Sequence, residues 1–433
     1  MNSIDKGNAG EKFVNDIAFK SFMRYWCYPS PKDEKGDKKE ICDLLIMFGD
    51  TTIIISVKNY EFKGDYSRYF RRTIDKAVKQ IYGAERKLFK SNRDIFIKHP
   101  ERETEKIPVS ESPKIHRVII NLGEGVKFYT FQKETKDEKF ISIFDKAAFK
   151  TIAEELDTIP DFIEYLSKRE KLFNDKNVTI LPGEEENFNQ ETAMQFFEHS
   201  QENFNPIEKT SILLSGTEHD LLAHYLKNER NFPEALHSDK YNGMFIQLDG
   251  YWEDFINRKH VLKKKQLDKN SHFIDELVKK EVLSNKNPQS IELAKELLSF
   301  DRFNRRIISN NFFEFYERYK DNKGLNFARR YGDINGKGVA FAFYPPDMEE
   351  KFVNVLLEIA IDSFCIYYNY KSSSIIMIAT TKDFSQFKIG MVQDIKPFSK
   401  EKEERIKEEV NKLHWFTNHQ EIKITEYEYP EEE

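Results

Sequence analysis

The sequence predicts a mixed α/β fold of the α+β type, divided into more than one domain. Two apolar, β-branched runs flank a tight turn within residues 40–58, which is typical of a hairpin. Residues 253–320 are charged with mainly helical spacing, and strand and helix patterns mix over residues 339–427. A chain of 433 residues also exceeds the usual size of one domain.

The first expected element is a helix over residues 8–25, because apolar residues recur there at helical spacing. Glu11 falls near its first turn, free to project off the apolar stripe. One interpretation is a solvated glutamate favoured by the helix dipole. The position of Glu11 one helix before the hairpin favours a functional role instead. The apolar positions are Phe13, Val14, Ile17, Ala18, Phe19, Phe22 and Met23.

Residues 40–58 predict a β-hairpin that the N-terminal region is organised around. Gly49, at the first central position of a two-residue loop, is the signal for a type II′ turn. This turn sets Asp43 opposite Ser56, and Lys58 shares the face of Ser56 because side chains two apart point the same way. A carboxylate and an ammonium therefore project together from two apolar strands. Burying such charges is costly unless they are paired or bind an ion.

Glu40 precedes Asp43 by three positions, and two interpretations of it stay open. On a regular strand the two side chains would point to opposite faces unless a bulge intervenes. Glu40 then either supplies an additional acidic ligand or begins the strand in solvent. The second interpretation is favoured by a small margin.

A basic, aromatic stretch follows the hairpin. Residues 61–94 hold ten Lys or Arg against five Asp or Glu, in a chain with a net charge of −6. Basic residues interleaved with Tyr and Phe are typical of a surface that follows phosphates and stacks on bases. A solvated helical face would look similar, but the neighbouring hairpin favours a nucleic-acid groove. The candidate residues are Lys63, Arg68, Arg71, Arg72, Lys76 and Lys79.

The same stretch contains a helix whose apolar positions Ala77, Ile81, Ala84 and Leu88 should face the sheet. Gln80 lies on the adjoining turn, where it can reach over the strand ends. As an alternative, Gln80 is an ordinary residue at the edge of the buried face.

Further strands are expected at residues 116–122 and 126–131, and helices at 146–156 and 161–172, with Asp161 as an N-cap. Composition becomes polar at residues 174–189, which indicates a boundary. The expected domains are residues 1–173, a linker at 174–190, a mostly helical region at 191–325 and an α+β domain of unknown role at 326–433.

Composition narrows the class of protein. A pI of about 6.0 argues against a protein that coats nucleic acid along its whole surface, although a local basic patch is compatible with it. Cys27, Cys42 and Cys365 form no CxxC pattern, which fits a reducing cytosol and excludes a zinc ribbon. Signal-like and membrane-spanning apolar runs are missing from the sequence, so we expect a cytoplasmic protein without a membrane partner.

The hairpin and its flanks resemble the PD-(D/E)xK superfamily of restriction-endonuclease-like nucleases. The signature of that superfamily, an Asp on one strand and (D/E)-x-K on the next, matches Asp43 and Ser56-Val57-Lys58. Glu11 matches an upstream helical Glu that faces the metal, and Gln80 matches a Gln on the helix after the Lys strand. Four such elements in order over about 75 residues make the match moderately specific. The departure is Ser56, a hydroxyl where the superfamily has a carboxylate.

This resemblance implies an N-terminal αβα domain with a Mg²⁺- or Mn²⁺-dependent endonuclease activity on DNA, while RNA stays open as a substrate. Asp43 and Glu11 would hold the ion, and Lys58 would orient or deprotonate the attacking water. Ser56 would be a weak neutral ligand, and Gln80 would point into the site. By fold-level analogy the protein is an effector of bacterial antiviral defence, with a second copy or a defence-system protein as partner. The alternative is a catalytically inactive nuclease fold that binds nucleic acid or scaffolds a complex.

Overall fold

The structure is a computed structural model that describes residues 3–21, 24–91, 93–107, 113–123, 139–181, 194, 211–238, 240, 243–285, 287–321, 327–417, 423 and 425–430. The expected mixed α/β class is confirmed, with helices and several sheets in one chain. The chain divides into two units, Met1–Val261 and Leu262–Glu433. Of the helices in the described ranges, none has the length and apolar character to cross a bilayer.

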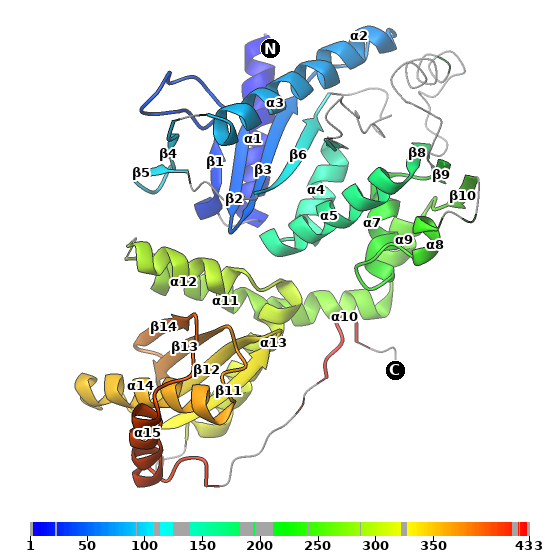
Figure 1. Cartoon of the computed structure of the whole chain (residues 1–433). Helices are drawn as coiled ribbons and strands as arrows, with labels where there is room; N and C mark the ends of the chain where they lie inside the picture. Colours follow the sequence, from blue (N-terminus) through cyan, green and yellow to red (C-terminus); the bar gives the residue numbers. More distant parts are fainter. Residues whose placement is uncertain are drawn as a thin grey trace. The chain divides into compact units, whose positions relative to one another are not determined.

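The first unit is built on a five-stranded mixed sheet with the order β1-β2-β3-β6-β7 (Figure 1). The first three strands pair antiparallel, and β3, β6 and β7 run parallel. Polar groups at the carboxyl ends of these parallel strands therefore lie along one edge of the sheet. The strands are β1 (Cys27–Pro29), β2 (Leu44–Phe48), β3 (Thr51–Lys58), β6 (Lys114–Asn121) and β7 (Ser142–Asp145).

The β2–β3 hairpin has the predicted register. Leu44 pairs with Ile55, and Phe48 pairs with Thr51. Gly49 has a φ of 59°, the left-handed value that a type II′ turn needs at its first central position. The same register carries Asp43, directly before β2, to the end of β3 that holds the predicted site.

Helices cover both faces of this sheet. On one face, α3 buries Ala77, Ile81 and Ala84 in a cluster that includes Ile54 of β3, as predicted. On the other side, α1 contacts β3 and α4. The helices are α1 (Ser3–Ser21), η1 (Arg24–Trp26), α2 (Tyr66–Phe70), the π-helical turn η2 (Arg71–Asp75), α3 (Lys76–Phe89), α4 (Lys146–Glu155) and α5 (Ile159–Asp175), and a small hairpin is formed by β4 (Phe96–Lys98) and β5 (Thr104–Lys106).

The predicted N-cap of α5 is wrong. Thr158 caps the helix, because its Oγ1 accepts a hydrogen bond from the Asp161 backbone N–H at 3.2 Å. Pro160 then lies within the first turn, where its missing N–H leaves no intrahelical bond unmade. Asp161 forms an ion pair with Arg230 instead. The strand expected at residues 126–131 lies outside the described residues.

A three-stranded parallel sheet, with the order β10-β9-β8, follows in the same unit. Its first strand occupies residues 177–181, within the segment expected as a linker, and Val178 and Ile180 are buried there. The rest of that segment, residues 182–190, is not described. The elements are β8 (Asn177–Leu181), β9 (Ser211–Ser215), α7 (Glu218–Lys227), α8 (Glu234–His237), β10 (Gly243–Gln247) and α9 (Tyr251–Ile256), and α10 (Lys259–Leu267) spans the division between the units.

The second unit contains a four-stranded sheet with the order β11-β12-β13-β14, in which β12 and β13 are parallel. α14 and α15 share a buried cluster with Met377 of β13. On the other face, Phe312 of α13 packs against Phe341 and Phe343. The elements are η3 (Asp268–Ser271), α11 (His272–Leu277), η4 (Val278–Val282), α12 (Pro288–Leu298), α13 (Arg302–Tyr319), β11 (Ala328–Ile334), β12 (Lys337–Tyr344), α14 (Glu350–Tyr367), β13 (Ser374–Thr381), β14 (Phe387–Gln393) and α15 (Lys400–Lys412).

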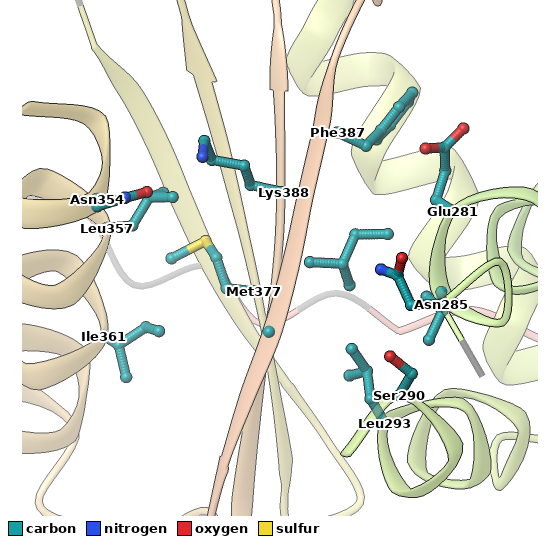
Figure 2. Close-up of a pocket in the computed structure, with 13 residues that line it drawn as sticks. Glu281, Asn285, Ser290, Leu293, Asn354, Leu357, Ile361, Met377, Phe387 and Lys388 are labelled. Carbon is teal, nitrogen blue, oxygen red and sulfur yellow. The ribbon is translucent and has the colours of Figure 1, made fainter. Parts of the chain in front are cut away.

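A cavity of about 390 Å³ adjoins the edge strand β14 of this sheet (Figure 2). Met377 lies on its apolar side, with Leu357 and Ile361 of α14. Asn285 and Ser290 contribute polar groups from the side of α12. The lining contains none of the residues predicted for the nuclease-like site.

A buried ion cluster joins α11 to α13 in the second unit. Arg302 Nη1 lies 2.6 Å from Asp275 Oδ2, and Arg305 pairs with the other carboxylate oxygen. Burial alone would raise the pKa of Asp275. The charges of Arg305 and Arg302, together with a hydrogen bond from His272, outweigh burial and hold this pKa well below its usual range.

Asp275→Asn is expected to lower the free energy of unfolding by about 3–5 kcal/mol at neutral pH, because two buried arginines lose their anion. A carboxyl whose pKa is lowered by folding stabilises the protein above its unfolded pKa, and this contribution is lost as the pH falls below about 3.9. Urea unfolding followed by circular dichroism should therefore show wild type and variant converging in acid. An equal difference at neutral and acid pH would show that the charge of Asp275 is not the cause.

Candidate functional site

The open end of the hairpin brings four of the predicted site residues together. Asp43 Oδ2 accepts a hydrogen bond from the Val57 backbone N–H at 2.5 Å. The same oxygen lies 3.1 Å from Ser56 Oγ and 3.6 Å from Lys58 Nζ. Gln80, from α3, reaches Ser56 Oγ at 3.2 Å through its Oε1. The predicted register therefore does place the acid and the amine on the same side of the sheet.

Ser56 is the centre of this network. Lys58 Nζ donates a hydrogen bond to Ser56 Oγ at 2.7 Å and another to the Val57 carbonyl at 2.9 Å. The hydroxyl carries a single proton, so it donates either to Asp43 or to Gln80 at one time. The hydroxyl thus connects a carboxylate, an ammonium and an amide from three different places in the chain.

The network is mostly enclosed. Asp43 is 7% exposed and Ser56 is 2% exposed, whereas Gln80 is exposed. Burial lowers the pKa of Lys58, although the charge of Asp43 opposes this shift. Gln80 therefore marks the side on which the network meets solvent, and Lys58 is an amine whose proton is easier to remove than usual.

The charge of Asp43 acts on two further acids. Partial burial, and then the charge of Asp43, raises the pKa of Glu11. For Glu40, partial burial, repulsion by Asp43 and Glu11, and a hydrogen bond with Asp43 raise the pKa. Glu40 is exposed, as expected for a residue that begins a strand, yet its carboxyl group interacts with Asp43. Of the two interpretations of Glu40, the structure adds support to the one that joins it to the site.

The oxygen donors of this site suit a hard divalent cation such as Mg²⁺, which prefers carboxylate, hydroxyl and carbonyl oxygens. In the described part of the chain, however, no three His, Cys, Asp or Glu side chains are grouped closely enough to hold an ion. One oxygen of Asp43 is already engaged by Val57 and Ser56. An ion beside Asp43 would need further oxygen ligands, and Glu11 and Glu40 are acids that already interact with Asp43.

The six predicted nucleic-acid-binding residues are all exposed. No ion pair joins any of them to another residue of the described ranges, in contrast to Lys106 and Lys114, which pair with Asp94 and Asp50. Most of the six lie on one nearly continuous helical run formed by α2, η2 and α3. Its π-helical turn, η2, is of a kind often found at functional sites. The residues are Lys63, Arg68, Arg71, Arg72, Lys76 and Lys79.

Asn121, which was not predicted as a site residue, ends β6 beside Lys58 in the β3–β6 pairing. Its side chain is fully buried, and its Nδ2 donates to the Tyr69 hydroxyl at 2.5 Å. Its Oδ1 accepts from the Gly123 N–H at 3.1 Å. Asn121 thereby fixes α2, which carries Arg68, to the strand end next to Lys58. The available signal was a polar residue that closes an apolar strand shortly before a glycine.

Comparisons with protein-family models, with curated proteins and with solved structures found no match for this chain. The resemblance to PD-(D/E)xK nucleases therefore stays a prediction from the motif. The contacts of Asp43, Ser56, Lys58 and Gln80 supply the physical basis for a functional proposal.

Ser56→Asp tests whether this pocket can hold a cation. Without an added ion, the second carboxylate is buried beside Asp43, so the midpoint of thermal unfolding should fall. Mn²⁺ should then restore it, since binding at a hundred times the dissociation constant stabilises the folded state by about 2.7 kcal/mol. Thermal unfolding with and without Mn²⁺ measures both effects.

Thr52→Asp is the matched control, because Thr52 lies on the same face of β3 and is 4% exposed. This control should lose stability without recovering it in Mn²⁺. If Mn²⁺ affects both variants alike, the pocket at Asp43 does not select a cation.

Proposed function

We propose that the first unit is a metal-dependent nuclease that hydrolyses phosphodiester bonds of DNA. The observation that carries this proposal is the meeting of Asp43 and Lys58 on one face of the hairpin, 3.6 Å apart, beside a helix whose Lys76 and Lys79 are exposed and form no ion pair with another described residue. The restriction-endonuclease-like fold belongs to the same proposal. Bacterial defence against foreign DNA is the setting that fold-level analogy suggests.

The residues that would hold Mg²⁺ or Mn²⁺ are Asp43 and Glu11, with Glu40 in place of the carboxylate that Ser56 lacks. A bound divalent ion would lower the pKa of a coordinated water and neutralise negative charge on the phosphate. Asp43 is kept in position without the ion, because Val57 N–H and Ser56 Oγ both bind its Oδ2. Binding of an ion would therefore cost little conformational entropy at Asp43, because its side chain is already held in position.

Lys58 is suited to accept a proton from the attacking water and to stabilise negative charge on the phosphate. In its neutral form, which a lowered pKa makes easier to reach, the amine would accept a proton from water. The water oxygen would bond to phosphorus as the P–O bond to the departing sugar breaks, and the departing oxygen would take a proton from solvent. In its charged form the same group stabilises the oxygens of the phosphate. Gln80 and the Val57 carbonyl keep this part of the strand in place through hydrogen bonds.

The exposed cations supply binding to the substrate. A row of exposed Lys and Arg side chains that pair with no anion among the described residues raises the local concentration of a polyanion, although the whole chain is acidic. Lys76 lies close enough to Lys58 for its charge to lower the pKa of Lys58. The row of exposed cations therefore extends to the candidate site. Nucleic acid held along α3 would therefore be delivered to Lys58.

Asp43→Ala and Lys58→Ala are expected to reduce Mg²⁺-dependent cleavage of plasmid DNA by at least about 100-fold, which is the usual range for losing a general base or an electrostatic group. Asp50→Ala and Lys114→Ala are the matched controls. That acid and lysine also form an ion pair, 3.5 Å apart, but they lie exposed at the turn end of the same strands. Cleavage by the controls should equal that of the wild type.

Cleavage that is unaffected by Asp43→Ala and Lys58→Ala would reject this site. An inactive module that binds nucleic acid is the second candidate function, because Ser56 replaces a carboxylate and the network of Asp43 is already closed within the chain. That candidate predicts binding of DNA by the wild type without cleavage in Mg²⁺ or Mn²⁺.

Arg72→Ala and Lys76→Ala should weaken DNA binding in a salt-dependent manner. Each lost phosphate contact lowers the slope of log affinity against log salt concentration by about 0.9 on duplex DNA. Fluorescence anisotropy over a series of salt concentrations measures this slope. Lys106→Ala, which removes a cation already paired with Asp94 at 2.8 Å, should leave the slope unchanged. Equal slopes for all three variants would show that the run formed by η2 and α3 is not the binding surface.

A further inference from the structure

Gly83 lies within α3, where glycine is an unfavourable choice for a helix. A Cβ added to Gly83 would meet no atom of the described chain within 4 Å outside its own helix and neighbours. Gly10 and Gly123 differ, because a Cβ there would collide with Leu122 or with the Tyr60 backbone. Packing within the described residues therefore explains Gly10 and Gly123 but leaves Gly83 unexplained.

Helical spacing places Gly83 on the basic face of α3. It follows Lys79 by four residues and Gln80 by three, and residues at these spacings are neighbours on a helix surface. The opposite face is buried against the sheet through Ala77 and Ile81. The half-buried glycine thus leaves the helix backbone without a side chain beside the exposed Lys79 and Gln80.

The helix backbone at Gly83 is adjacent to the candidate site. Gln80 stands one turn from Gly83 and reaches Ser56 Oγ at 3.2 Å. Glycine permits a ligand to approach the helix backbone closely, since no side chain intervenes. The cations Lys76 and Lys79 precede it along the same face and are exposed. A ligand that is polyanionic and extended would meet all of these features in order.

We infer that the sugar-phosphate backbone of the bound nucleic acid crosses α3 over Gly83, touching the helix backbone there, before it reaches Lys58. This inference rests on the proposed function and adds a contact point to it. It assigns to Gly83 a steric role, because any side chain at this position would hold the nucleic acid away from Lys79 and Gln80.

The test uses the full chain with Gly83→Gln and Gly83→Ala, and a short random-sequence DNA duplex in EDTA, so that binding is measured without cleavage. Both substitutions should raise the midpoint of thermal unfolding by about 2–4 °C, because both side chains favour a helix more than glycine does. Gly83→Gln should nevertheless weaken binding about tenfold in fluorescence anisotropy, a loss of about 1.4 kcal/mol, and Gly83→Ala should weaken it less. Gly332→Gln is the control, since Gly332 of β11 is exposed and also has open space around it. It should bind as the wild type does.

A folded Gly83→Gln variant with unchanged affinity overturns the inference and leaves the nuclease proposal standing. A wild type that does not bind DNA overturns the proposed function itself. If Gly83→Gln lowered the unfolding midpoint, the substitution would have met an atom of the chain, and the steric role of Gly83 toward a ligand would be rejected.

Discussion

The hydrogen bond from the Val57 N–H to the Asp43 carboxylate is the interaction on which the site depends. A buried carboxylate must be compensated, and here a backbone donor, a hydroxyl and an ammonium share that task. Since Val57 lies between Ser56 and Lys58, fixing its backbone also fixes the two side chains that flank it. The alternation of side chains along a strand then directs both of them to the face of Asp43.

The basic helical run is held to the same strand ends by two polar contacts. Gln80 joins α3 to Ser56, and the Tyr69 hydroxyl joins α2 to Asn121 at the end of the neighbouring strand. The apolar face of α3 supplies most of the packing, whereas these contacts set where the cations lie along the strand direction. The geometry of the site and that of the charged surface are consequently coupled.

Local rules explain what could be predicted from the sequence. Gly49 specified the turn, the turn specified the register, and the register placed Asp43, Ser56 and Lys58 together. The position of Asn121 beside Lys58 could not be found in this way, because it depends on pairing between strands separated by the whole of α3. The interaction of Glu40 with Asp43 belonged to the less favoured of two open interpretations, for a different reason. The strand begins only at Leu44, so the alternation of faces does not apply to the three residues between Glu40 and Asp43.

A carboxylate in place of the Ser56 hydroxyl would change the charge balance of the site more than its shape. A carboxylate there would stand beside Asp43 with Lys58 as the nearest cation, while burial and then the charge of Asp43 already raise the pKa of Glu11 and of Glu40. With a neutral Ser56, Lys58 can bind the hydroxyl and keep its lowered pKa, since a second anion at that position would raise it. A neutral side chain at position 56 therefore leaves the pKa of Lys58 lowered, and Glu40 is a further acid whose carboxyl group interacts with Asp43.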